Sequence, residues 1–217
     1  FLQGTGLGKK YITTDKVIWT GNPILINESN ITKHQALQEF GLHTELPVLF
    51  VIGGATGSMS LNELIVESLP ELTKVVQVIH NTGPNKEIKV KHANYQSHDY
   101  MENMDSAYKA ADVVLSRAGI STLTELALHG KPSIVVPMPD THQEFNADLL
   151  YRTKSAIVLD QTELDTEVLI KTIRKILFDN NLQKSMQKNF QNLFPKNSAN
   201  KIYHLITDYL EKSHVKK

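Results

Sequence analysis

Residues 111–147, ADVVLSRAGISTLTELALHGKPSIVVPMPDTHQEFNA, contain the pattern that decides the fold of this 217-residue chain. Short apolar runs alternate with a helical segment, and small or polar residues occupy the junctions. The helical segment keeps Leu123, Leu126 and Ala127 on one side and ends at a glycine followed by a proline, a common helix stop. The pattern predicts a strand at 113–115, a turn at 116–119, a helix from about 121 to 130–132, a second strand at 133–136 and a loop at 137–143.

The turn between the first strand and the helix carries most of the chemistry. Ser121 and Thr122 offer hydroxyls where the helix is expected to begin, and Glu125 follows one turn later. A helix start that faces a strand end gathers unpaired backbone N–H groups and the positive end of the helix dipole, so it suits an anion, most often a phosphate. Plain N-capping by Ser121 and Thr122 is the alternative, and the two roles are compatible.

Strand and helix patterns alternate along the rest of the chain as well. Val48–Ile52 is a continuous apolar run followed by glycines, which is typical of a strand buried on both faces. Further strands are predicted at 17–20, 75–80, 88–93 and 156–159, and helices at 33–40, 58–74, 104–111, 164–178, 181–192 and 199–212. Pro70 predicts a kink or an early end in the helix at 58–74. The alternation indicates an α/β fold, a Rossmann-like parallel sheet with right-handed crossovers and helices on both faces.

The composition argues against several classes of protein. Lysine plus arginine equals aspartate plus glutamate at 23 each, so net charge gives no argument for nucleic acid as a partner. The chain has no cysteine, which excludes disulfides and thiolate metal sites. No apolar run approaches the ~18 residues of a membrane span. Because the sequence starts at Phe1 and not at a methionine, we expect it to be a fragment of a longer protein.

A glycine-rich turn, GGATGS at residues 53–58, lies directly between the apolar strand and the following helix. Glycine permits positive φ and lets a ligand approach the backbone closely. The spacing matches neither the Walker A motif nor G-x-G-x-x-G, so a tight turn without a ligand is an equal alternative. If the turn binds phosphate, Thr56 and the backbone N–H groups are the candidate donors. Its place at the carboxyl end of a strand is where open parallel sheets bind ligands.

Three hydrogen-bonding side chains follow the second strand of the opening stretch: His142, Gln143 and Asn146. Amide side chains suit the hydroxyls of a carbohydrate. The structural alternative is a helix cap near Thr141 with Gln143 exposed. Asp140 and His142 are too few ligands to indicate a metal. The remaining histidines lack ligand spacing and are expected to lie on the surface or in packed positions.

Four motifs in one order make this sequence resemble the donor-binding half of the MurG-type glycosyltransferases. The family's S-R-[SA]-G-x-x-T-x-x-E run corresponds to SRAGISTLTE at 116–125, and its H-Q-x-x-N-A run to HQEFNA at 142–147. TGNP at 20–23 and GGATGS at 53–58 precede them in the family's order. The family often has Ser-Gln where this chain has Ala55 and Thr56, and an arginine where it has Leu25. The resemblance therefore leaves the preferred donor sugar open.

The resemblance implies the carboxy-terminal domain of a two-domain GT-B enzyme. The implied reaction is inverting transfer of N-acetylglucosamine from UDP-GlcNAc to an undecaprenyl-diphosphate-linked muramyl pentapeptide in peptidoglycan synthesis. It implies that the glycine-rich turn faces the diphosphate, that Glu125 binds the ribose and that Gln143 binds the sugar. It also places uracil near Met101 and Tyr100, where Tyr100 as a core aromatic is the alternative. The predicted donor-binding residues are Gly53, Gly54, Thr56, Gly57, Met101, Arg117, Gly119, Ser121, Thr122, Glu125, His142, Gln143 and Asn146.

Some roles stay open within this interpretation. Arg117 is equally compatible with pairing to the diphosphate and with a plain salt bridge. An exposed glutamate is usually only a solvated charge, which is the alternative for Glu125. No metal or other cofactor is implied, and no catalytic base is identified in the chain. We therefore expect the chain alone to bind the donor without turnover.

The resemblance also implies a division of the chain and a place of action. Residues 1–23 correspond to the end of an amino-terminal domain and a linker, residues 24–198 to the donor-binding domain, and residues 199–217 to a helix that packs back on the amino-terminal domain. That other domain would bind the lipid-linked acceptor and contact the membrane, so the enzyme is expected in the cytoplasm, peripheral at the inner membrane face. The alternatives are another lipid glycosyltransferase, such as a diacylglycerol glycosyltransferase, a non-catalytic nucleotide-sugar-binding subunit, and a regulatory nucleotide-binding module.

Overall fold

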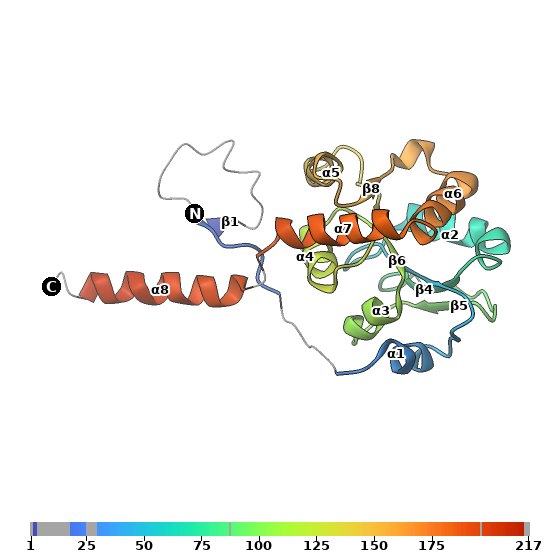
Figure 1. Ribbon diagram of the computed structural model, residues 1–217, viewed down its shortest axis with the longest axis horizontal. Coiled ribbons are helices and arrows are strands. Elements are labelled where there is room, and N and C mark those ends of the chain that lie inside the picture. Colours follow the sequence, from blue (N-terminus) through green and yellow to red (C-terminus); the bar gives the residue numbers. More distant parts are fainter. Residues whose placement is uncertain (1, 4–17, 25–29, 87, 196, 215–217) are drawn as a thin grey trace.

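The computed structural model describes residues 2–3, 18–24, 30–86, 88–195 and 197–214 of the chain. Its main body is a six-stranded sheet with helices on both faces (Figure 1). The strands of this sheet are β3 (Val48–Ile52), β4 (Gln77–Asn81), β5 (Tyr95–His98), β6 (Val113–Ser116), β7 (Ser133–Val135) and β8 (Ile157–Val158). The helices described are α1 (Lys33–Glu39), α2 (Met59–Leu72), α3 (Met104–Ala110), α4 (Ile120–His129), α5 (Gln143–Arg152), α6 (Thr166–Leu177), α7 (Asn180–Leu193) and α8 (Ser198–His214), with a 3-10 turn, η2, at Gln161–Glu163.

The sheet is parallel throughout, in the order β5-β4-β3-β6-β7-β8. The chain leaves β3 through α2 toward β4 on one side, and leaves β6 through α4 toward β7 on the other side. The direction of winding therefore reverses between β3 and β6, which pair from Leu49↔Val113 to Ile52↔Ser116. Open α/β sheets bind ligands at such a switch point, outside the carboxyl ends of the strands. The predicted Rossmann-like α/β fold is confirmed.

The continuous apolar run of β3 is explained by two separate cores. Val48, Phe50 and Ile52 face a core that α1, α3, α4, α5 and the end of α7 cover. Leu49 and Val51 face the opposite core, which α2 and α6 cover. All five side chains are buried because a central parallel strand is covered on both faces.

One predicted strand is wrong. Residues 88–93 alternate apolar and polar side chains, but the edge strand is β5, which begins at Tyr95. The backbone hydrogen bonds of β4 reach Asn94 and His98 instead. Residues 88–91 run outside this edge, where the Val90 side chain is exposed and the Ile88 carbonyl accepts a hydrogen bond from the Ser97 hydroxyl. Period-two alternation indicated a strand, but the partner strand selected a later segment.

Of the two alternatives for Pro70, a kink or an early end, the early end is wrong, since α2 continues through Pro70 to Leu72. Proline removes one backbone donor, whose acceptor would be the carbonyl of Val66 four residues earlier. Val66 is exposed, so water can replace the missing bond. The following strand, β4, begins at Gln77, two residues later than expected. Leu25, where the family carries arginine, lies outside the described residues.

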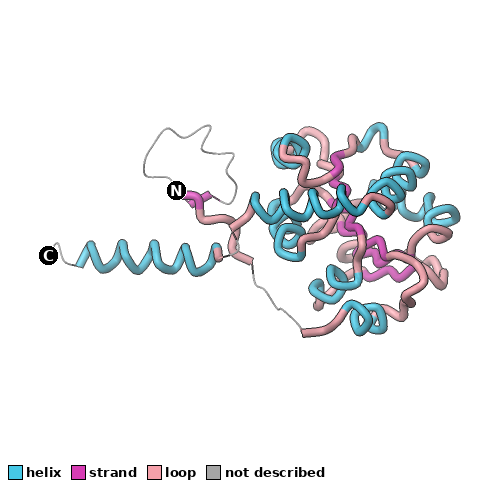
Figure 2. Tube along the Cα trace, in the orientation of Figure 1, coloured by secondary structure: helices cyan, strands magenta, loops and turns pink. Residues whose placement is uncertain are grey.

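The last helix stands apart from the sheet. α8 extends away from the body on the same side as the short parallel pair β1 (Leu2–Gln3) and β2 (Ile18–Trp19) (Figures 1 and 2). Its large exposed side chains are Tyr203, Ile206, Tyr209 and Leu210. Within the described part of the chain, no helix combines the length and apolar character needed to cross a membrane.

Candidate functional site

The fold brings the predicted donor-binding residues to one edge of the sheet. Each follows the carboxyl end of a strand or opens the next helix: the glycine-rich turn follows β3, Met101 follows β5, residues 117–125 follow β6, and residues 142–146 follow β7. The N-termini of α2, α4 and α5 therefore point to the same edge, and their dipoles make it electropositive. This carboxyl edge is the candidate functional site.

The glycine-rich turn is held by its backbone and by a second glycine turn that the sequence analysis missed. The Gly57 N–H donates to the Gly54 carbonyl at 3.0 Å, and both residues have positive φ, at +69° and +89°. Gly83 also has positive φ, at +94°, and packs directly against Gly57. A Cβ added to Gly57 would lie 2.0 Å from the Thr82 carbonyl oxygen, so only glycine fits. The Gly-Pro pair at 83–84 was a usable turn signal.

Lys86 also contacts the glycine-rich turn, and it was not among the predicted site residues. Its ammonium group donates to the carbonyls of Thr56 and Gly57, at 2.5 and 3.3 Å. The contact ties the β4–β5 connection to the glycine-rich turn. It also places a positive charge against the peptide groups expected to face a diphosphate.

The N-terminus of α4 has no side-chain cap. Gly119 is the N-cap residue and contributes no hydroxyl, so the alternative of plain N-capping by Ser121 and Thr122 is wrong. They lie one and two residues into the helix, where Ser121 is exposed and Thr122 is buried. The first backbone N–H groups of an α-helix have no partner within the helix. The uncapped end of α4 can therefore bind an anion.

Glu125 is half-buried, so it is not a plain solvated charge. Its Oε2 accepts a hydrogen bond of 2.7 Å from the hydroxyl of Tyr108 on α3. Burial raises the pKa of Glu125, and the bond from Tyr108 partly offsets that rise. Within the described residues Oε1 has no hydrogen-bond partner, so one carboxylate oxygen can still accept bonds from a ligand.

Arg117 is bound to neutral groups of the protein and not, among the described residues, to a carboxylate. Its side chain is buried, and in the described part of the chain it contacts no carboxylate. The guanidinium instead donates to the hydroxyls of Ser58 and Ser60 at the start of α2, to the Gln161 amide oxygen, and to the Val136 and Pro137 carbonyls. The salt-bridge alternative is thus wrong, and all the guanidinium donors of Arg117 are occupied. Burial lowers the pKa of Arg117.

These hydrogen bonds make Arg117 a structural residue that also contributes positive charge to the carboxyl edge. It joins the loops that follow β3, β7 and β8 to the loop that carries it. Its positive charge is surrounded by neutral acceptors, so the charge is not cancelled locally and adds to the positive potential of the edge. Ser58, Ser60 and Gln161 were not predicted as site residues. Only Ser58, an N-cap residue before a helical pattern, left a sequence signal.

Gln143 and Asn146 brace the turn before α4. The Gln143 amide oxygen accepts from the Ala118 and Met138 N–H groups, both at 3.1 Å, and the Asn146 amide nitrogen donates to the Ala118 carbonyl at 2.9 Å. The alternative of an exposed Gln143 is therefore wrong. Because the amide oxygen is fixed, the Gln143 amide nitrogen is directed elsewhere and has no partner among the described residues. It remains available to a ligand.

The remaining predicted residues divide between surface and core. His142 is exposed and is the N-cap residue of α5, while the Thr141 hydroxyl accepts the Gln143 N–H at 3.2 Å. Met101 is buried in the core between the sheet and α3. Tyr100 is 68% exposed, so its alternative role as a core aromatic is wrong. Among the described residues no group of three histidine, aspartate or glutamate side chains could hold a metal ion.

The TGNP motif lies beside this edge. Gly21 has positive φ, and a Cβ there would lie 2.3 Å from the Ser198 hydroxyl oxygen. The Asn22 side chain donates to the Thr124 hydroxyl at 3.4 Å, which anchors the TGNP motif to α4 one residue before Glu125. A cavity of about 210 Å³ lies between Asn22, α4 and the α7–α8 junction, and none of the predicted donor-binding residues lines it.

The geometry and the comparisons with known proteins indicate the same class of protein, the GT-B glycosyltransferases. The fold is that of the carboxy-terminal Rossmann-like domain of GT-B glycosyltransferases. MurG of Acinetobacter baumannii superposes with a TM-score of 0.66 at 21% sequence identity, over 95% of this chain and 64% of that one. The family model described as glycosyltransferase family 28 C-terminal domain matches residues 48–202, so the chain belongs to this family.

Two curated relatives are named UDP-N-acetylglucosamine–N-acetylmuramyl-(pentapeptide) pyrophosphoryl-undecaprenol N-acetylglucosamine transferase. The protein of Thermoanaerobacter sp. (strain X514) is 33% identical over 211 residues, or 91% of this chain. That of Bacillus subtilis (strain 168) is 31% identical over 212 residues, or 92% of this chain. The chain spans 58% of the length of each relative.

Proposed function

We propose that this chain is the donor-binding domain of an enzyme that transfers N-acetylglucosamine from UDP-GlcNAc to an undecaprenyl-diphosphate-linked muramyl pentapeptide. One observation carries the proposal: the uncapped N-terminus of α4 and the open oxygen of Glu125 lie one helical turn apart at the switch point of the sheet. A helix N-terminus suits a diphosphate, and a carboxylate suits the hydroxyls of a ribose. The names of the two curated relatives describe the same transfer.

The other predicted residues take roles consistent with this arrangement. In the proposed complex the backbone of Gly53, Gly54 and Gly57, with the Thr56 hydroxyl, faces the diphosphate together with Gly119, Ser121 and Thr122. The Gln143 amide nitrogen and His142 face the sugar, and the backbone around Met101 faces the base. Arg117 acts through the loops that it holds, because all its donors are occupied, and Asn146 acts through its bond to the Ala118 carbonyl.

We assign no catalytic base among the described residues, so the proposed reaction also uses another part of the parent protein. An acceptor hydroxyl oxygen bonds to the anomeric carbon as the bond from that carbon to the diphosphate oxygen breaks, and the electron pair leaves with UDP. The N-terminus of α4 and the glycine-rich turn stabilise the growing charge on UDP. The hydroxyl proton passes to a base in another part of the parent protein, where the lipid-linked acceptor binds.

The proposal extends to the whole protein and its location. The exposed apolar side chains of α8 provide a face for packing against the acceptor-binding part of the parent protein. A lipid-linked acceptor and a soluble nucleotide sugar meet at a membrane surface, so we place the enzyme in the cytoplasm as a peripheral protein of the inner membrane face.

Calorimetric titration of the chain with UDP-GlcNAc, UDP-GalNAc and UDP-glucose tests the proposal. We expect preferential binding of UDP-GlcNAc, and a loss of at least about tenfold in affinity for Glu125→Ala, because a hydrogen bond to a charged group is removed. Glu67→Ala is the matched control, since Glu67 is an exposed glutamate on α2. Binding of none of the three sugars, or equal affinity of Glu125→Ala and the unmodified chain, contradicts the proposal.

A further inference from the structure

Tyr108 is a fully buried tyrosine whose hydroxyl reaches the candidate ribose-binding carboxylate. It lies on α3, with no exposed surface, and donates to Glu125 Oε2 at 2.7 Å. Tyr108 belongs to none of the four sequence motifs and is not among the predicted donor-binding residues. The contact connects a core side chain of one helix with the candidate ligand-binding group of the next.

The ring of Tyr108 is held in place on two sides. His129, at the end of α4, stacks on it with ring centroids 4.7 Å apart and planes 13° from parallel. Phe50 of β3 meets it edge-on at 5.2 Å and 86°. The ring therefore cannot tilt without disturbing the core, and the hydroxyl has a fixed position. A hydrogen bond from such a ring fixes the carboxylate that accepts it.

The chemistry of the pair sets the direction of the hydrogen bond when Glu125 is ionised. Burial and the neighbouring Glu125 raise the pKa of Tyr108, so the phenol keeps its proton and donates it to the carboxylate. Oε2 is therefore engaged by one donor, while Oε1 is unpartnered among the described residues. Each oxygen retains at least one lone pair for a ligand. Such a carboxylate can accept from two adjacent hydroxyls without first choosing a rotamer.

We propose that Tyr108 is a positioning residue that holds the Glu125 carboxylate in the orientation that recognises the two adjacent hydroxyls of a ribose. The inference rests on the proposed function, since it assigns the ligand of Glu125. It extends that function to a selectivity: the site distinguishes a ribonucleotide from its 2′-deoxy form, and Tyr108 provides part of the distinction. A preorganised carboxylate gains affinity because less conformational entropy is lost on binding.

Titrations with UDP and 2′-deoxy-UDP, on the full 217-residue chain, test the inference. We expect Tyr108→Phe to weaken UDP binding about tenfold, the usual effect of losing one charge-assisted hydrogen bond, and to weaken 2′-deoxy-UDP binding less. The ratio of the two affinities should therefore approach one. In a Glu125→Ala background, Tyr108→Phe should cause no further loss, because the group that it positions is gone.

Tyr95→Phe is the matched control. Tyr95 is also buried, and its hydroxyl bonds to His80 instead of Glu125, at 3.0 Å. This variant should lose comparable stability and keep the affinity ratio of the unmodified chain. Glu125→Asp gives an independent test, because a carboxylate one methylene shorter loses the Tyr108 contact. It should reduce the ratio as Tyr108→Phe does.

The outcomes separate the inference from the proposed function. If Tyr108→Phe weakens both nucleotides equally, or adds its full loss in the Glu125→Ala background, Tyr108 supports only the fold and the inference is overturned. If the unmodified chain binds UDP and 2′-deoxy-UDP equally, Glu125 does not read the ribose, although donor binding stands. If it binds neither nucleotide, the proposed function is overturned together with the inference.

Discussion

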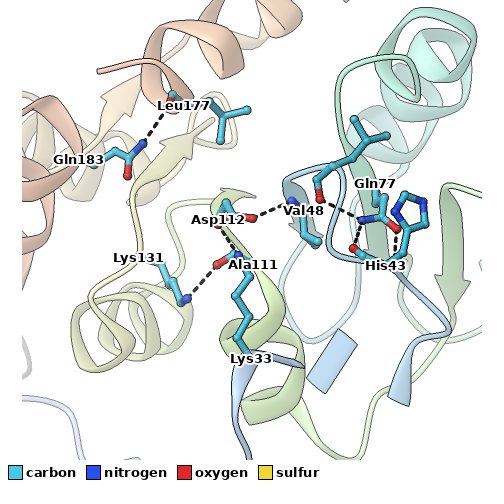
Figure 3. A network of polar contacts seen from close by, with 10 residues as sticks. Lys33, His43, Val48, Gln77, Ala111, Asp112, Lys131, Leu177 and Gln183 are labelled. Carbon is cyan, nitrogen blue, oxygen red and sulfur yellow. Dashed lines mark hydrogen bonds and ion pairs between the residues drawn. The ribbon is translucent and has the colours of Figure 1, made fainter. Parts of the chain in front are cut away.

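The two edges of the sheet use the same kinds of polar side chain in opposite ways. At the amino edge Asp112 accepts the Val48 N–H and pairs with Lys33, while Gln77 bonds to the backbone of His43 and Leu46 (Figure 3). At the carboxyl edge one side-chain oxygen of Glu125 and one of Gln143 accept hydrogen bonds from the protein. The second oxygen of Glu125 and the amide nitrogen of Gln143 have no partner among the described residues. A carboxylate and an amide are thus structural at one edge and available at the other.

The difference follows from the backbone hydrogen-bonding groups that are exposed at each edge. At the amino edge the side chains complete backbone hydrogen bonds where strands begin, as Lys131 also does by donating to the Ala111 carbonyl (Figure 3). At the carboxyl edge helix N-termini supply extra donors, and α4 has no side chain to satisfy them. The surplus of donors at the carboxyl edge makes it the ligand-binding edge.

The largest effect is expected from a glycine at the carboxyl edge. Gly83→Ala places a Cβ 2.5 Å from the Gly57 Cα, in addition to the strain of positive φ, and should cost about 3 kcal/mol of unfolding free energy. Donor affinity should fall too, because the glycine-rich turn must move. Urea unfolding and calorimetry measure the two effects.

Gly41→Ala is the control. Gly41 also has positive φ, at +62°, but no atom lies within 4 Å of an added Cβ. It should lose only about 1 kcal/mol, the cost of the left-handed conformation, without a change in donor affinity. Equal losses for the two variants would show that the contact between Gly57 and Gly83 is not tight.

The next largest effect distinguishes the carboxylate of Asp112, at the amino edge, from that of Glu125, at the carboxyl edge. Asp112→Ala removes the acceptor of the Val48 N–H and the partner of Lys33, and should lower the unfolding free energy by about 2 kcal/mol. It should leave the affinity for UDP-GlcNAc unchanged, in contrast to Glu125→Ala. A loss of donor affinity in Asp112→Ala would contradict the division of roles between the edges.

A smaller, pH-dependent effect on the unfolding free energy is expected from His80, a buried residue of β4 near the carboxyl edge. His80 is fully buried between Asn62 and Tyr95, and burial lowers its pKa to about 3. The unfolded chain takes up a proton near pH 6.5 and the native chain does not, so stability is lost as the pH falls from 6.5 toward 3. The loss is at most about 1.4 kcal/mol per pH unit.

His80→Gln should therefore make the decline of unfolding free energy between pH 6 and pH 4 shallower, although the variant is less stable at neutral pH. His34→Gln, at an exposed histidine, should keep the slope of the unmodified chain. Urea unfolding across this pH range measures both slopes. An unchanged slope in His80→Gln would mean that His80 is protonated in the native state.

The smallest effect has the opposite sign. Burial raises the pKa of Glu125, so its ionised form destabilises the native state above that pKa, and the penalty disappears as the pH falls. At neutral pH Glu125→Gln should raise the Tm by roughly 1–3 °C, since the amide oxygen can still accept from Tyr108. Asp112→Asn should lower the Tm instead. A lower Tm for Glu125→Gln in thermal unfolding would contradict this account.

Much of the site followed from sequence patterns because its parts are local. A glycine-rich turn after an apolar strand, and a glutamate one turn into a helix, are both fixed by neighbours within a few residues. Arg117 was harder, because six hydrogen bonds to three segments (58–60, 136–137 and 161) decide its role and none of its partners is close in sequence. Lys86 and Gly83 were missed because their contact with the glycine-rich turn crosses about one βα unit of chain.

The sequence alone determined the class of fold, since hydrophobic periodicity and helix stops depend on local chain geometry and on the burial that each strand requires. It also determined which loops reach the carboxyl edge, because a parallel sheet places every strand end on the same side. The tertiary structure decided which polar atoms the protein uses and which it leaves open. It selected residues 95–98 over residues 88–93 as the edge strand, engaged all donors of Arg117, and joined Tyr108 to Glu125. Such pairings depend on the three-dimensional packing of distant segments, which no local pattern encodes.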